Sequence, residues 1–271
     1  MLCRTMPTWS LQRRDDGRVA VLTFIRPPRN FMSFASMTEL EPLLQDLAAD
    51  ESVNVVVLTG GLPGYFIAHA DLDDLAAIGA GQPVEGDPRA WGRVLTLLES
   101  MPQPVVAAVN GQAHGGGSEL CWACTIRVVA ESGHFGQPEV NVGIIPGAGG
   151  TQRLPRLIGP GRAAELVLSG RPVRAEESVA IGMASAVLPD DNFLHHALEW
   201  VAPIAAKPRA ALVAAKRALV EGMRLPLDEA LRLEGQLFIE LQLSEGAVQL
   251  EQSAIARYRA TPPDQSIELS P

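Results

Sequence analysis

The sequence contains few cysteines, few aromatic residues and no long apolar run. Cys3, Cys121 and Cys124 are its only cysteines, and an odd number without a regular spacing indicates a reducing compartment rather than a disulfide framework. No apolar run approaches the roughly 20 residues that a membrane-spanning helix needs. Residues 1–10 lack the apolar stretch of a signal peptide. We therefore expect a cytoplasmic protein with no membrane partner.

Basic residues are also scarce. The chain carries 22 Lys and Arg against 31 Asp and Glu, which gives a formal net charge of −9. This excess of acid would repel the phosphates of a nucleic acid, so no nucleic-acid partner is expected. A small anionic ligand stays open, because a few local dipoles and basic groups can outweigh the net charge.

Apolar residues make up 47% of the 271 residues, which is enough for one large α/β domain with a helical appendage. Short runs rich in Val and Ile indicate buried strands. These strands are expected at 19–24, 53–58, 105–109 and 126–130.

The second half of the chain has a different pattern, which is almost entirely helical. Helices are expected over 162–168, 175–181, 193–206, 209–221 and 227–243, with one short strand at 186–188. We therefore predict a core over 1–200 that carries the active site, a helical region over 201–260 and a flexible tail over 261–271.

An amphipathic helix is expected near residues 37–47, where four apolar residues share one face. Ser36 followed by Glu39 has the spacing of a capping box at its start. Pro42 lies inside this segment and predicts a kink or a restart of the helix there.

A glycine-rich turn follows the strand at 105–109. Gly115, Gly116 and Gly117 precede a helical pattern that begins at Ser118. Glycines let backbone N–H groups approach a ligand closely, and the start of a helix adds partial positive charge. The turn could hold a phosphate, or an oxygen that becomes negative during a reaction.

Two carboxylates stand close to this turn in the sequence. Glu119 lies in the expected first turn of the helix, where ordinary stabilisation by the helix dipole would explain it equally well. Glu139 follows Gly136, Gln137 and Pro138 in a rigid loop, a setting in which functional residues are common. Together the two could serve as general acid and base.

These segments resemble the enoyl-CoA hydratase/isomerase (crotonase) superfamily. Four spaced blocks carry the resemblance, and their combination is far more specific than any one of them. The blocks are residues 109–111, 115–120, 135–140 and 143–154. A weaker likeness extends from about Arg18 to about Arg257.

The resemblance implies a catalytic site built from main-chain and carboxylate groups. The backbone N–H groups of Ala70 and Gly116 would form an oxyanion hole for a thioester carbonyl. Glu119 would activate a water molecule, and Glu139 would protonate the α-carbon of a 2-enoyl thioester. Gly147 would help to position the water and a carboxylate.

The resemblance also implies the fold, the partners and the remaining binding residues. The fold would be a spiral core of repeated ββα units followed by C-terminal helices, in an enzyme of fatty acid metabolism that forms homotrimers or homohexamers. No metal or redox cofactor is implied, because coenzyme A is part of the substrate. The substrate-binding candidates are Ala68, His69, Asp71 and Arg257. His69 stands where the family usually has Gly, and we expect it to be a packed or solvent-facing bystander.

Other readings of the same residues carry less weight. Cys121 and Cys124 form a C-x-x-C without further metal ligands, so two buried cysteines on a helix are expected. His114 with the three glycines is similar to an esterase oxyanion motif, but no G-x-S-x-G nucleophile elbow is present. A related isomerase, a thioester hydrolase and a non-catalytic relative stay open.

Overall fold

The computed structural model describes residues 7–262 and 264–266. The chain divides into two compact units, Met1–Ala205 and Ala206–Pro271. Cys3 and most of the predicted tail, residues 263 and 267–271, lie outside the described residues. Within the described residues, no helix is both long and apolar enough to cross a membrane.

A six-stranded sheet forms the centre of the first unit. Its order is β1-β2-β4-β7-β9-β12, with β1 antiparallel to β2 and the remaining neighbours parallel. The predicted strands are confirmed, and β1 is an addition to them. The strands are β1 (Trp9–Arg14), β2 (Val19–Phe24), β4 (Val55–Gly60), β7 (Val105–Val109), β9 (Ile126–Ala130) and β12 (Ala186–Leu188).

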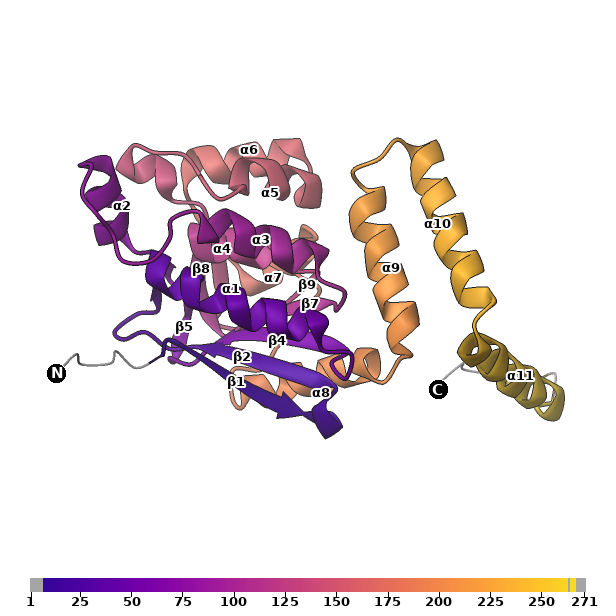
Figure 1. The fold of residues 1–271 in the computed structure, drawn as a ribbon. Coiled ribbons are helices and arrows are strands. Elements are labelled where there is room, and N and C mark those ends of the chain that lie inside the picture. The colour runs from indigo at the N-terminus through magenta and orange to yellow at the C-terminus, as the bar shows by residue number, and fades with distance from the viewer. Residues whose placement is uncertain (1–6, 263, 267–271) are drawn as a thin grey trace. The chain divides into compact units, whose positions relative to one another are not determined.

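Both faces of this sheet are buried, and the alternation of side chains along each strand divides them between two cores. Val55 and Val57 of β4 pack in a cluster with α8 (Phe193–Ala205). Val56 and Leu58 belong to the larger core on the opposite face, together with α1 (Phe34–Ala49), α3 (Ala90–Ser100) and α4 (Gly116–Ala123). Figure 1 shows α8 on the other side of the sheet from α1 and α3.

A second sheet of shorter strands runs beside the first, with the order β11-β10-β8-β5. The four central long strands β2, β4, β7 and β9 are each followed by short strand and then by helix, as in β7, β8 and α4, so the prediction of a repeated ββα core is confirmed. The short strands are β5 (Gly64–Ile67), β8 (Gly111–His114), β10 (His134–Gly136), β11 (Pro172–Arg174) and the separate pair β3 (Phe31–Met32) and β6 (His69–Ala70). The other helices of this unit are η1 (Asp15–Gly17), α2 (Leu72–Gly79), η2 (Glu139–Val142), α5 (Gly150–Ile158), α6 (Pro160–Ser169) and α7 (Ala175–Ala180).

The capping box predicted for the first helix is wrong. The helix α1 is capped by Ser33, whose hydroxyl accepts the N–H of Ser36, and Glu39 instead accepts the backbone N–H groups of Thr8 and Trp9. The helix also does not restart at Pro42. A proline inside a helix costs about 3 kcal/mol, and the fully buried apolar face of α1 offsets this cost.

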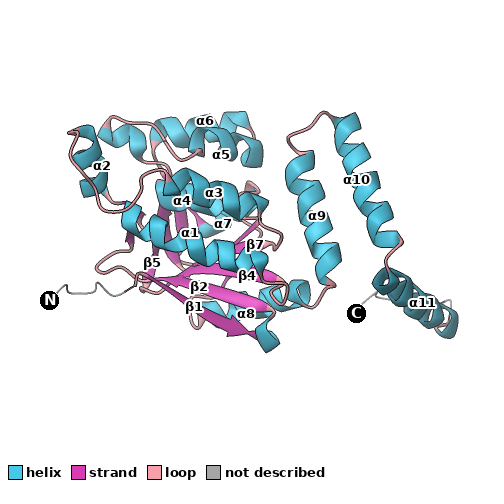
Figure 2. Cartoon of the chain, in the orientation of Figure 1, coloured by secondary structure: helices cyan, strands magenta, loops and turns pink. Residues whose placement is uncertain are grey.

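Among its described residues, the second unit consists of helices joined by short turns (Figure 2). It contains α9 (Arg209–Gly222), α10 (Leu227–Gln242) and α11 (Glu245–Ala260), of which α11 was not predicted as a separate helix. A groove between α9 and α10 is lined mainly by Ala and Leu. Several large apolar side chains of this hairpin are exposed, among them Leu219, Met223, Leu227, Leu231 and Phe238.

A buried asparagine joins the loop after β2 to the strand β5. Asn30 is fully buried and has a positive φ of 55°. Its side-chain amide donates to the carbonyl groups of Phe24, Tyr65 and Phe66, and its oxygen accepts the N–H of Arg26. One side chain therefore satisfies backbone groups of two strands, β2 and β5, that are far apart in the sequence.

We expect Asn30→Gly to lower the free energy of unfolding by about 2–4 kcal/mol, because several backbone groups each lose a hydrogen bond. Glycine tolerates the positive φ, so the change isolates the side-chain hydrogen bonds. Chemical denaturation measures the loss. Asn192→Gly is the matched control, since Asn192 is exposed and also has a positive φ. Equal effects of the two substitutions would contradict this role of Asn30.

Candidate active site

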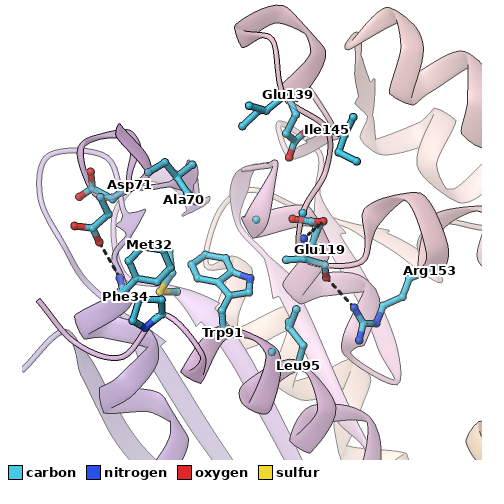
Figure 3. Close-up of a pocket in the computed structure, with 18 of the residues that line it drawn as sticks. Met32, Phe34, Ala70, Asp71, Trp91, Leu95, Glu119, Glu139, Ile145 and Arg153 are labelled. Carbon is cyan, nitrogen blue, oxygen red and sulfur yellow. Dashed lines mark hydrogen bonds between the residues drawn. The ribbon is translucent and has the colours of Figure 1, made fainter. Parts of the chain in front are cut away.

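A pocket of about 540 Å³ lies in the first unit, and the glycine-rich turn forms part of its wall. Helices α2, α3 and α4 contribute residues to it, as does the loop that follows η2. Figure 3 shows Trp91, Glu119 and Ile145 around this space. Its lining is largely apolar, with Met32, Phe34, Leu75, Trp91, Leu95, Ile144 and Ile145.

Two backbone N–H groups are candidates for an oxyanion hole. Gly116 is the first residue of α4, so its N–H has no partner within the helix. Asp71 N–H donates to Met32 on β3, and successive N–H groups of an extended segment point to opposite sides, so that of Ala70 points away from β3. A Cβ built on Gly116 would lie 3.4 Å from the Cβ of Ala70. The two residues are therefore direct neighbours on one pocket wall.

Close packing explains why the turn needs three glycines. A Cβ at Gly115 would lie 2.9 Å from a carboxylate oxygen of Glu139, and this residue has a positive φ of 52°. At Gly116 it would meet the Trp91 ring at 2.5 Å, and at Gly117 the carbonyl oxygen of Ile67 at 2.1 Å. A side chain at Gly115 or Gly116 would displace Glu139 or Trp91, and one at Gly117 would clash with the backbone of β5.

Glu119 is held in the pocket wall by two backbone amides. Its carboxylate is 2% exposed and accepts N–H groups of Ala148 and Gly150, each at 2.7 Å. Gly150 begins α5, so the carboxylate also faces the positive end of a helix. Burial raises the pKa of Glu119, while the two amides and Arg153 oppose this shift.

Fewer hydrogen-bond donors offset the burial of Glu139 than that of Glu119. Burial raises its pKa to about 7, and the negative charge of Glu119 adds to this shift. Its Oε2 atom is buried and has no hydrogen-bond partner among the described residues. Near neutral pH the pair therefore contains one carboxyl that binds a proton easily and one that is stabilised by N–H donors.

Comparison with known proteins identifies the family. The sequence model of the enoyl-CoA hydratase/isomerase family matches residues 14–256. The chain belongs to this family. The family that the sequence motifs predicted is therefore confirmed.

Individual relatives agree with this assignment. The chain is 36% identical to the short-chain-enoyl-CoA hydratase of Clostridium acetobutylicum, over 83% of this chain and 86% of the relative. It is 39% identical to the 2,3-dehydroadipyl-CoA hydratase of Escherichia coli, over 84% and 88%. Among solved structures, an enoyl-CoA hydratase from Bacillus anthracis superposes with a TM-score of 0.84 at 35% identity, covering 92% of this chain and 96% of that one.

The remaining residues predicted from the family lie in different settings. Gly147 and Asp71 line the pocket, and Asp71 also pairs with Arg26 at 2.6 Å. Ala68 is 1% exposed, so its side chain is buried. Its carbonyl accepts the N–H of His114. Arg257 belongs to α11 in the second unit, and its contact with a substrate stays a prediction.

The cysteines play no visible part in the pocket. Cys121 and Cys124 are buried, as predicted, although Cys124 lies just after the last residue of α4. Burial raises the pKa of the Cys121 thiol well above its usual range. No group of three or more His, Cys, Asp or Glu side chains within the described residues is arranged to hold a metal ion.

Sequence reasoning missed several residues of the pocket. Trp91 and Leu95 come from α3, in a segment that carries no motif, and their one signal is apolar spacing along a helix. Arg153, within a recognised block, donates to the carbonyl of Ala148 at 2.8 Å and pairs with Glu99. It thereby fixes the loop whose amides hold Glu119.

We expect Glu139 to titrate near pH 7 in the folded protein. In Glu119→Gln its pKa should fall, because the neighbouring negative charge is removed while the volume is kept. Infrared difference spectra of the protonated carboxyl band measure the pKa of Glu139 in the wild type and in Glu119→Gln. Glu199→Gln on the exposed side of α8 is the control. A Glu139 titration near pH 4.5 would contradict the burial argument.

Proposed function

We propose that this protein is an enoyl-CoA hydratase, which adds water syn across the double bond of a 2-enoyl-CoA thioester to give a 3-hydroxyacyl-CoA. The observation that carries the proposal is that Glu119 and Glu139 line one largely apolar pocket together with Ala70 and Gly116, the two candidate amide donors. Membership of the enoyl-CoA hydratase/isomerase family supports it. A crotonyl-CoA hydratase from Syntrophomonas wolfei is 36% identical over 82% of the chain.

In the proposed mechanism, the amides of Ala70 and Gly116 bind the thioester oxygen. They stabilise the negative charge that develops there when the β-carbon is attacked, and one such donor contributes roughly 3–4 kcal/mol. Coenzyme A enters as part of the substrate, and no metal or redox cofactor takes part in the proposed reaction.

The two carboxyl groups divide the proton transfers. Glu119, stabilised as a carboxylate by the N–H groups of Ala148 and Gly150, removes a proton from water as its hydroxyl binds to C3. Glu139, whose pKa is raised to about 7, gives a proton to C2. Gly147 lines the pocket and helps to position the water. The retained carboxylate pair favours hydration over isomerisation or thioester hydrolysis, which need only one such group.

We also propose that the chain assembles as a homotrimer or a homohexamer through its second unit. Leu227 and Leu231 on α10 are 74% and 56% exposed, although both are large and apolar. Exposed apolar faces of this extent mark interaction surfaces.

Purified protein should hydrate crotonyl-CoA, measured by the loss of enoyl-thioester absorbance. Glu119→Gln and Glu139→Gln should each lower kcat by roughly 10²–10⁴-fold, because each removes a proton-transfer group and keeps the side-chain volume. Glu199→Gln is expected to keep full activity. A double variant of Glu119 and Glu139 with wild-type kcat would refute the assigned roles.

Light scattering should give a mass of three or six chains of 28.9 kDa. Leu231→Asp should dissociate the assembly, since it places a charge in an apolar contact. Leu168→Asp is the matched control, because Leu168 is 75% exposed on α6 in the first unit. A monomeric wild-type protein would contradict this proposal.

A further inference from the structure

His69 makes two contacts that a glycine could not make. Its Nδ1 lies 2.6 Å from the carbonyl oxygen of Ala70. Its ring stacks on Phe31, with ring centroids 4.4 Å apart and an interplanar angle of 25°. A carbonyl oxygen can only accept, so the proton of this hydrogen bond is on Nδ1 of His69.

The side chain causes no backbone strain at this position. Among the described non-glycine residues, positive φ values occur only at Asp15, Asp16, Asn30 and Asn192. His69 therefore has a backbone conformation that any residue adopts. It is accommodated in the turn, and its contacts act on the neighbouring peptide groups.

The peptide that carries the Ala70 N–H lies between two fixed peptides. On one side, the carbonyl of Ala68 accepts from the N–H of His114, and the N–H of Ala68, one peptide earlier, donates to the carbonyl of Asn30. On the other side, the peptide of Ala70 and Asp71 is fixed at both ends: Asp71 N–H donates to Met32, and the Ala70 carbonyl accepts from His69. Because the peptides before and after it are held by hydrogen bonds, the peptide that carries the Ala70 N–H has little freedom to rotate.

We propose that His69 is a positioning residue for the oxyanion hole. Its Nδ1–H fixes the carbonyl of Ala70, stacking on Phe31 fixes the imidazole, and the two together hold the Ala70 N–H toward the pocket. This inference rests on the proposed function. It assigns a role to the residue that replaces the glycine usual in the family. A displacement of about 1 Å at such a donor is enough to impair catalysis.

Three substitutions separate the two contacts. His69→Asn keeps an N–H donor at the position of Nδ1 but loses the stacked ring. His69→Phe keeps a stacked ring but loses the donor, and His69→Gly loses both. His195→Asn is the control, because His195 is exposed on α8 and its side chain faces Glu199.

We expect His69→Phe and His69→Gly to lower kcat for crotonyl-CoA about 5- to 20-fold with little change in KM, since the lost hydrogen bond is one of ordinary strength. His69→Asn should stay within about threefold of the wild type. Wild-type kcat in His69→Phe would overturn the proposal. So would variants that change only KM, because His69 would then act in substrate binding.

A spectroscopic measurement tests the same point without turnover. Butanoyl-CoA has no double bond to hydrate, and oxyanion donors shift its thioester C=O stretch to lower wavenumber. The infrared shift on binding should be smaller in His69→Phe and His69→Gly than in the wild type or His69→Asn. Equal shifts in all four proteins would overturn the role of His69. Failure of the proposed function is distinguished by a wild-type protein that shows this shift but hydrates no enoyl-CoA.

Discussion

The candidate site depends on how closely the backbone at Gly115, Gly116 and Gly117 approaches its neighbours. Each of these residues lies against a different element: the carboxylate of Glu139, the ring of Trp91 and the β5 carbonyl of Ile67. Protein interiors are packed so densely that a single methyl group would displace one of these contacts. The absence of side chains at the start of α4 thus determines where its N–H groups point.

The same close packing produces two unlike carboxyl groups within one pocket. Glu119 is the more deeply buried, yet N–H donors from the start of α5 surround one of its oxygens. The negative charge of Glu119 raises the pKa of Glu139, and the Oε2 atom of Glu139 has no hydrogen-bond donor among the described residues. In the proposed mechanism, a difference in hydrogen bonding, rather than in residue type, would therefore separate the proton acceptor from the proton donor.

Much of this arrangement could be predicted from the sequence, and the reason is local. The glycines, Glu119 and Glu139 lie in short sequence blocks, so their residue types and spacing can be recognised without knowledge of distant contacts. Trp91 could not be predicted, because its contact with Gly116 arises only when α3 packs on α4. The amides of Ala148 and Gly150 likewise reach Glu119 across 29 and 31 residues. At Pro42, burial of the apolar face of α1 outweighs the tendency of proline to end a helix.

The division of the site among successive ββα repeats has a consequence for biosynthesis. Ala70 comes from the second of these repeats, Gly116 and Glu119 follow the third long-and-short strand pair, and Glu139 follows the fourth. A nascent chain that ends before β9 would contain both candidate amide donors and one carboxylate, but not the second carboxylate. The complete set of site residues would therefore be present only after the fourth repeat has been synthesised and has packed on the third.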